Sequence, residues 1–238
     1  MKKHIPNIIT LGNVFCGCLG LVFAFEGNYE AVAICVVVAL ICDFLDGFVA
    51  RALGVSSPIG KDLDSLADMV TFGVLPSIVM FQLMKQLNCT TGVCTGLLSP
   101  DYYSYTAFLI ALASALRLAK FNNDTRQSDK FIGLPTPANC AFLISLPLIY
   151  SIYPDFVLFT QPRVLLGVVF LFSYLLLAEL PLIALKFKDF SFSGNFIRYL
   201  LILISIVLVV IFKIIAIPII VVVYITLSII DNLLSRRQ

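Results

Sequence analysis

The chain contains no tryptophan and a single histidine, and only 13% of its 238 residues are charged. Without tryptophan, the nine tyrosines must supply any aromatic belt at a membrane interface. The histidine, His4, stands just before an apolar segment, which favours an interfacial position over a catalytic one. The basic residues are scattered and the net charge is +2, so the composition argues against a nucleic-acid partner.

Hydrophobic residues are what the chain has in excess. They make up 60% of it and give a mean hydropathy of +1.02, whereas soluble domains average about 45–50% apolar residues. No internal repeat divides the chain, so we expect one all-α, polytopic membrane domain over residues 1–238. Eight spans are predicted, at about 5–25, 30–53, 59–85, 104–121, 137–153, 163–186, 196–213 and 216–234.

Basic residues are distributed unevenly between the two ends of these spans. If the N-terminus lies inside, thirteen of the sixteen lysines and arginines fall at inside segments or inside helix ends. Only Lys85, Arg163 and Lys213 fall outside. Because lysine and arginine mark the cytoplasmic side, this pattern predicts a multi-pass protein of the cell membrane with both termini in the cytoplasm.

Four aspartates stand between two apolar runs, at positions 43, 46, 64 and 68. A carboxylate inside a membrane span costs about 2.5–3.5 kcal/mol on insertion scales, so these residues indicate a functional site. The spacings of three and four residues place each pair on one face of a helix. A turn near residues 54–58, with Ser57 as N-cap and Pro58 at the first helical position, makes the two helices antiparallel.

The antiparallel arrangement allows the four carboxylates to converge at the cytoplasmic end of the bundle. Unpaired, they would repel one another, and some would have to stay protonated. Divalent cations remove that repulsion, and an all-oxygen ligand set favours Mg²⁺, Mn²⁺ or Ca²⁺ over zinc.

The full pattern resembles the signature of the CDP-alcohol phosphotransferases, with every specified position present. It reads Asp43-x2-Asp46-Gly47-x2-Ala50-Arg51-x8-Gly60-x3-Asp64-x3-Asp68. Three further phrases, at residues 70–76, 115–123 and 131–139, resemble the phosphatidylserine synthase branch of that family. These phrases extend the resemblance from about residue 5 to about residue 140.

The resemblance implies transfer of a phosphatidyl group from CDP-diacylglycerol to an alcohol, with release of CMP. It implies two divalent cations, Mg²⁺ or Mn²⁺ with Ca²⁺ as a further option, held by Asp43, Asp46, Asp64 and Asp68. Asp68 is also expected to act as the general base. Seven residues are expected to bind CDP-diacylglycerol: Asn7, Thr10, Gly47, Ala50, Arg51, Ser57 and Gly60.

Two of these expectations leave alternatives open. The polar residues of the first span recur at positions 7, 10 and 13, so they face the bundle interior and serve either the ligand or helix packing. Arg51 either binds phosphate or forms an ion pair with one of the aspartates.

The branch resemblance implies L-serine as the acceptor. Arg117 and Lys120 share a face at the cytoplasmic end of the fourth span, where they either bind the serine carboxylate or extend to lipid phosphates. Glycerol 3-phosphate and inositol phosphate remain alternative acceptors, since charge alone does not separate them from serine. A divalent-cation transporter is a remote alternative, because its acids would be spread across the bilayer. The family resemblance also leaves a homodimer open, and Cys89 and Cys94 are either a disulfide or two free thiols.

Overall fold

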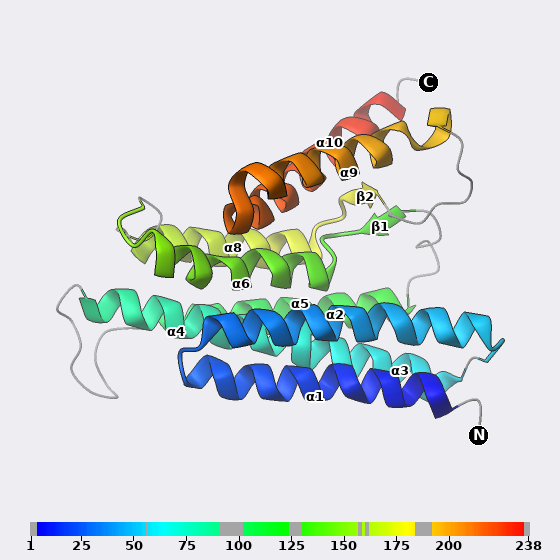
Figure 1. The fold of residues 1–238 in the computed structure, drawn as a ribbon, viewed down its shortest axis with the longest axis horizontal. Helices are drawn as coiled ribbons and strands as arrows, with labels where there is room; N and C mark the ends of the chain where they lie inside the picture. The colour runs from blue at the N-terminus through cyan, green and yellow to red at the C-terminus, as the bar shows by residue number, and fades with distance from the viewer. Residues whose placement is uncertain are drawn as a thin grey trace.

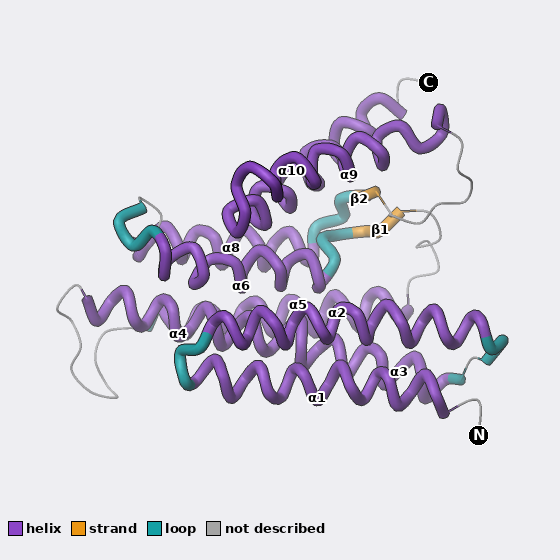
Figure 2. Tube along the Cα trace, in the orientation of Figure 1, coloured by secondary structure: helices purple, strands orange, loops and turns teal. Residues whose placement is uncertain are grey.

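The computed structural model describes residues 4–55, 57–90, 102–123, 130–156, 159, 162–183 and 192–235. Cys94, the side chain of Cys89 and several of the basic residues used in the topology prediction lie outside the described residues. The described residues are almost entirely helical, with two three-residue strands (Figure 2).

The chain begins with α1 (Ile5–Phe25), α2 (Tyr29–Ala52) and α3 (Pro58–Asp68). A π-helical turn, η2 (Met69–Val74), joins α3 to α4 (Leu75–Thr90), and the 3₁₀ turn η3 (Ser104–Ala107) leads into α5 (Phe108–Asn123). Strand β1 (Lys130–Ile132), α6 (Thr136–Ile152), α8 (Pro162–Leu177) and β2 (Pro181–Ile183) follow. The last elements are α9 (Phe192–Phe212), the 3₁₀ turn η4 (Lys213–Ile215) and α10 (Ala216–Ser235).

The helices form layers. Helices α1 to α5 make one group, α6 and α8 lie against it, and α9 and α10 cross above them (Figure 1). Helices joined by loops run in alternating directions, so α1 begins, α2 ends and α10 ends toward the same end of the bundle (Figure 1).

Five helical segments of the described chain are long and apolar enough to cross a membrane: 5–25, 29–52, 58–87, 104–123 and 195–233. The last of these holds two helices, because the chain reverses at η4, where Lys213 has a φ of 49°, and α9 packs against α10. Helices α6 and α8 are shorter apolar segments. The protein is therefore an all-α, multi-pass membrane protein. Each of the eight predicted ranges contains a helical segment, although eight crossings stay a prediction.

The sixth predicted range, 163–186, extends too far. Helix α8 ends at Leu177, and the chain then forms β2, which pairs antiparallel with β1. Pro181 cannot continue a helix, because it lacks an N–H group and restricts the residue before it. Gly133, with a φ of 81°, packs so close to the end of α8 that a Cβ there would lie 2.7 Å from the Leu176 carbonyl oxygen.

A polar stripe on α10 holds the C-terminal hairpin against β2. The Tyr224 hydroxyl donates to the Ile183 carbonyl over 3.0 Å, and the Ser228 hydroxyl accepts from the Ile183 N–H at 3.2 Å. Asn232 donates to the Pro181 carbonyl. These side chains are four residues apart and so share one face of α10. That face satisfies backbone groups of β2, whose one strand neighbour within the described part of the chain is β1.

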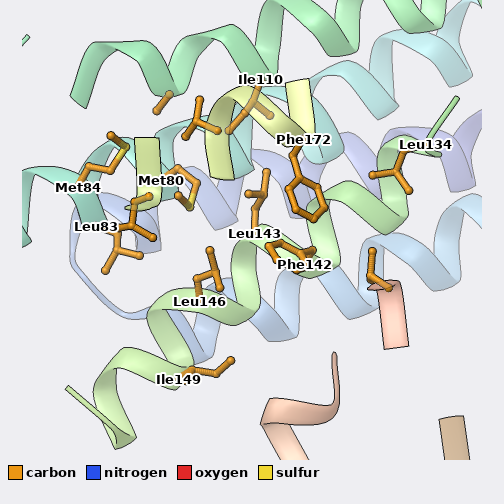
Figure 3. Close-up of a cluster of buried hydrophobic side chains, with 14 of the residues drawn as sticks. Met80, Leu83, Met84, Ile110, Leu134, Phe142, Leu143, Leu146, Ile149 and Phe172 are labelled. Atoms are coloured by element: carbon orange, nitrogen blue, oxygen red, sulfur yellow. The ribbon is translucent and has the colours of Figure 1, made fainter. Parts of the chain in front are cut away.

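The main hydrophobic core lies between α4, α5, α6 and α8. Figure 3 shows Met80 and Leu83 from α4, Ile110 from α5 and Leu143 from α6 in one cluster with Phe172 from α8. A second, smaller cluster joins α1 and α2 to η2, α4 and α6. These two cores fix α2, η2 and α6 relative to one another, which sets the geometry of the site described next.

Candidate active site

The turn between α2 and α3 forms as its sequence predicts. Helix α2 ends at Ala52, and Gly54 takes a φ of 63° in the turn. The Ser57 hydroxyl accepts a hydrogen bond from the Gly60 N–H at 3.0 Å, and Pro58 is the first residue of α3. The predicted N-cap is therefore confirmed, and it sets the direction in which α3 leaves the turn.

Three carboxylates converge across the space between α2 and α3. One oxygen each from Asp43, Asp64 and Asp68 lies within 4.8 Å of the other two. All three side chains are half-buried. Oxygen ligands at this separation suit a divalent cation such as Mg²⁺ or Ca²⁺.

The fourth carboxylate, Asp46, is held by α1. It is buried, and its Oδ2 accepts a hydrogen bond of 2.5 Å from the Thr10 hydroxyl. Asp46 is still close enough to repel Asp43, Asp64 and Asp68 electrostatically. The predicted convergence therefore takes the form of three clustered carboxylates with the fourth beside them, fastened to another helix.

Helix α1 keeps α2 and α3 apart. It packs along α2 and also contacts α3 and η2, whereas α2 and α3 barely contact each other directly. The gap contains a cavity of about 280 Å³. Six of the seven residues expected to bind CDP-diacylglycerol line it: Asn7, Thr10, Gly47, Ala50, Ser57 and Gly60. Asp46 and Asp64 also face this cavity.

Arg51, the seventh residue, lies at the margin of the cavity. It is exposed, and its Nη1 lies 3.4 Å from the position that a Cβ on Gly47 would take. Within the described residues Arg51 makes no ion pair with an aspartate, so the guanidinium is available to a ligand bound against Gly47.

Lys61 is a cavity residue that the sequence reasoning missed. It lines the same cavity, and its ammonium group donates to the Asn122 carbonyl over 2.6 Å. Asn122 in turn donates to the Ser65 hydroxyl at 2.7 Å, which links the end of α5 to α3. Its place in the sequence could have indicated this role, because Lys61 directly follows the signature residue Gly60.

The structure separates Arg117 from Lys120. Arg117 is only 6% exposed and interacts electrostatically with Asp68, whereas Lys120 is exposed. Two side chains that are three residues apart in the sequence point about 60° apart around a helix. In α5 this difference is enough to turn Arg117 inward and Lys120 outward. Of the two residues expected at the acceptor site, only Arg117 is turned toward the buried side of α5, near enough to Asp68 to interact with it electrostatically.

Asp68 lies where three helical elements meet. It is followed by η2, in which the Thr71 hydroxyl donates to the Asn13 carbonyl at 3.1 Å. The Cys140 thiol of α6 donates to the Thr71 carbonyl at 3.7 Å. Helix α1 approaches so closely that a Cβ on Gly17 would lie 2.4 Å from the Thr71 hydroxyl. π-helical turns often occur at functional sites, and this one joins the last carboxylate to α1 and α6.

Several buried polar atoms, on Asp68 itself and on α1, α5 and α6, have no partner among the described residues. They are Asp68 Oδ1, Arg117 Nε, the Ser114 hydroxyl and the side-chain amides of Asn13 and Asn139. Buried polar groups in proteins are nearly always hydrogen-bonded, so unpaired ones mark places for water or ligand. Two of them, Asp68 Oδ1 and Arg117 Nε, belong to side chains that interact electrostatically with each other, so this part of the site suits a polar ligand.

The chain matches the family model described as CDP-alcohol phosphatidyltransferase over residues 3–182. It is 33% identical over 149 residues to the CDP-diacylglycerol–serine O-phosphatidyltransferase of Bacillus subtilis (strain 168), a match that covers 63% of this chain and 78% of that protein. It is 32% identical over 179 residues to the enzyme of the same name from Helicobacter pylori (strain J99), covering 74% and 70%.

A further relative is the archaetidylserine synthase of Methanothermobacter thermautotrophicus, which is 31% identical over 138 residues that cover 56% of this chain and 53% of that protein. The matched family region contains the whole carboxylate site and ends before α9 begins.

The carboxylate cluster generates a prediction about metal binding that does not depend on turnover. The purified protein should bind Mn²⁺. This binding can be measured from the decrease of the electron paramagnetic resonance signal of free Mn²⁺. Asp64→Asn should weaken that binding by at least about tenfold, because it removes a charged ligand oxygen. Asp62→Asn is the matched control, since Asp62 lies on the same helix but is exposed and outside the cluster. Equal affinities in the two variants would remove the metal assignment.

Proposed function

The chain belongs to the CDP-alcohol phosphatidyltransferase family, and from this premise we propose that it transfers a phosphatidyl group from CDP-diacylglycerol to L-serine. The products are phosphatidylserine and CMP. The observation that carries the proposal is the cluster of Asp43, Asp64 and Asp68 beside a cavity lined by the expected nucleotide-binding residues. The names of the relatives support serine as the acceptor.

The carboxylates fit divalent cations, since three of them offer oxygens within 4.8 Å of one another and a fourth lies beside them. We propose that Asp43, Asp64 and Asp68 hold one Mg²⁺ or Mn²⁺ and that Asp46 contributes to a second. When bound, the cations neutralise the pyrophosphate charge and stabilise the attacking and leaving oxygens of the displacement.

The cavity between α1, α2 and α3 would hold the cytidine diphosphate part of the lipid. Gly47, Ala50 and Gly60 leave room against the helices, while Asn7 and Ser57 offer polar contacts. Arg51 and Lys61 stand at the cavity as cations for phosphate oxygens. Binding here places the phosphorus that carries diacylglycerol near the three carboxylates.

Asp68 is the base in this proposal. It directly precedes η2, lies near Arg117 of α5 and Cys140 of α6, and its Oδ1 has no partner among the described residues. The serine hydroxyl gives its proton to Asp68, and its oxygen bonds to the phosphorus that carries diacylglycerol. The bond from that phosphorus to the bridging oxygen breaks, and CMP leaves with that oxygen. Positioning within hydrogen-bond reach is the main requirement for such a base.

Arg117 is the residue we propose for the serine carboxylate. It is buried beside Asp68, so a serine bound to it would present its hydroxyl to the base. Lys120 faces away from the site. Arg117, the one arginine on α5 and turned inward there, matches one carboxylate, whereas the phosphate dianion of glycerol 3-phosphate or inositol phosphate would favour a second cation.

We further propose that the site faces the cytoplasm. The start of α1, the turn between α2 and α3 and the end of α10 lie at one end of the bundle (Figure 1). That end carries Arg51, Lys61 and Lys120, while Lys85 and Lys213 belong to the opposite ends of their helices. This distribution agrees with the excess of basic residues on the cytoplasmic side of membrane proteins.

Replacing the base should separate binding from turnover. Asp68→Asn should lower kcat by at least about 10²-fold, the usual contribution of general base catalysis, while still binding CDP-diacylglycerol. Turnover is measured as CMP release, and binding as protection against thermal unfolding by CDP-diacylglycerol. Asp62→Asn, on the exposed face of the same helix, should keep the wild-type rate. An Asp68→Asn variant with near wild-type turnover would assign the base to another residue.

Arg117 and Lys120 form a matched pair for testing the acceptor site. Losing a charge-assisted hydrogen bond to a carboxylate costs about 1.5–3 kcal/mol, so Arg117→Ala should raise the KM for serine by roughly 10- to 150-fold. The KM for CDP-diacylglycerol should stay nearly unchanged. Lys120→Ala should change neither constant appreciably, because that side chain is exposed. If Arg117→Ala weakens both substrates equally, Arg117 binds the lipid phosphates instead.

A further inference from the structure

Arg117 has two aromatic neighbours in addition to Asp68. The ring centroid of Phe121, one turn further along α5, lies 5.8 Å from Arg117 Cζ. Tyr224 of α10 is close enough to Arg117 to interact with it electrostatically. Because Tyr224 and Arg117 are both buried, little solvent separates the phenol from the guanidinium to screen this interaction. Helix α10 therefore reaches the side chain proposed for the acceptor carboxylate.

The hydroxyl of Tyr224 can act only as an acceptor toward Arg117. Its single proton is already donated to the Ile183 carbonyl over 3.0 Å, which leaves the lone pairs of the oxygen for other partners. A guanidinium has five N–H donors and no acceptor. The phenol oxygen and the guanidinium are therefore complementary in charge and in hydrogen-bonding capacity.

Strand β2 fixes the place of this phenol. Ile183, which accepts the Tyr224 proton, lies opposite Lys130 in the β1–β2 pair. The N–H group of Ile183 donates to the Ser228 hydroxyl, so both of its backbone polar groups bind α10. The ring of Tyr224 is also part of the main hydrophobic cluster. The phenol oxygen is thus held by the strand and the core, independently of Arg117.

Arg117 needs such a fixed neighbour more than most buried side chains do. Its Nε has no hydrogen-bond partner among the described residues. An arginine side chain has many rotamers, and it binds a carboxylate best when its planar fork of N–H groups is already oriented toward the two oxygens. A rigid acceptor beside the guanidinium restricts that orientation before the ligand arrives, which lowers the entropy lost on binding.

We propose that Tyr224 is a positioning residue for the acceptor, an inference that rests on the proposed function. Its hydroxyl oxygen holds the Arg117 guanidinium in the orientation that receives the serine carboxylate. Tyr224 acts through Arg117 and need not contact either substrate. The matched family region covers residues 3–182, whereas Tyr224 lies on α10. A helix outside that region thus contributes to the choice of acceptor.

Tyr224 and Ser228 provide a matched pair for the test. Both are buried, they lie one turn apart on α10, and each forms one hydrogen bond to Ile183. Of the two, Tyr224 is the one beside Arg117. Tyr224→Phe should raise the KM for serine by about three- to tenfold, with the KM for CDP-diacylglycerol and the affinity for Mn²⁺ within about twofold of wild type. Ser228→Ala should leave all three within about twofold, although each variant loses one buried hydrogen bond and some thermal stability.

A double variant separates positioning from a purely structural role. If Tyr224 acts through Arg117, its hydroxyl has nothing left to orient once Arg117 is replaced. The variant that combines Arg117→Ala with Tyr224→Phe should therefore have the same KM for serine as Arg117→Ala alone, within about twofold. A further increase equal to the effect of Tyr224→Phe by itself would show that the two residues act independently, and would overturn the positioning role.

Turnover of the wild-type protein with serine keeps the two proposals distinguishable. If the wild type forms no phosphatidylserine, the proposed function fails and this inference fails with it. If the wild type forms phosphatidylserine and Tyr224→Phe keeps the wild-type KM for serine, only the positioning role is wrong. The same conclusion follows if Ser228→Ala raises that KM as much as Tyr224→Phe does, or if Tyr224→Phe weakens both substrates equally.

Discussion

Four carboxylates inside membrane-spanning helices are the constraint on which the rest of this structure depends. Each is costly in an apolar environment, and together they repel one another. Helix α1 reduces the problem by donating from Thr10 to Asp46 and by keeping α2 and α3 apart. The space thus created holds the remaining three carboxylates within reach of a single cation.

Helix α2 lines two cavities of different polarity. Its second half presents Asp43, Asp46, Gly47 and Ala50 to the carboxylate cluster and to the cavity between α1, α2 and α3. Its first half lines an apolar cavity against α6. The shared hydrophobic cluster with η2 and α6 keeps both halves in register.

Local sequence signals predicted much of this arrangement. The spacing of the aspartates, the Ser57 N-cap and the apolar runs specify helices and faces through contacts a few residues apart, and the structure has them in place. The family assignment rests on the same short stretch and is confirmed. The roles of individual residues in metal, nucleotide and serine binding stay predictions.

Features that depend on distant contacts were not predictable. The π-helical turn η2 forms where α1 and α6 both contact Thr71, and β2 forms where β1 and the stripe on α10 satisfy its backbone. The early end of α8 follows from the same pairing. The different orientations of Arg117 and Lys120 depend on which side of α5 faces Asp68, which spacing alone left undecided.

The most direct test of the central claim is to measure which acceptor the purified wild-type protein uses. The protein is incubated with labelled CDP-diacylglycerol and Mg²⁺ or Mn²⁺, in parallel with serine, glycerol 3-phosphate or inositol phosphate. We expect labelled phosphatidylserine and an equal amount of CMP with serine, no lipid product with the other two acceptors, and no product in excess EDTA. A product formed from glycerol 3-phosphate and not from serine, or full turnover in EDTA, would contradict the account.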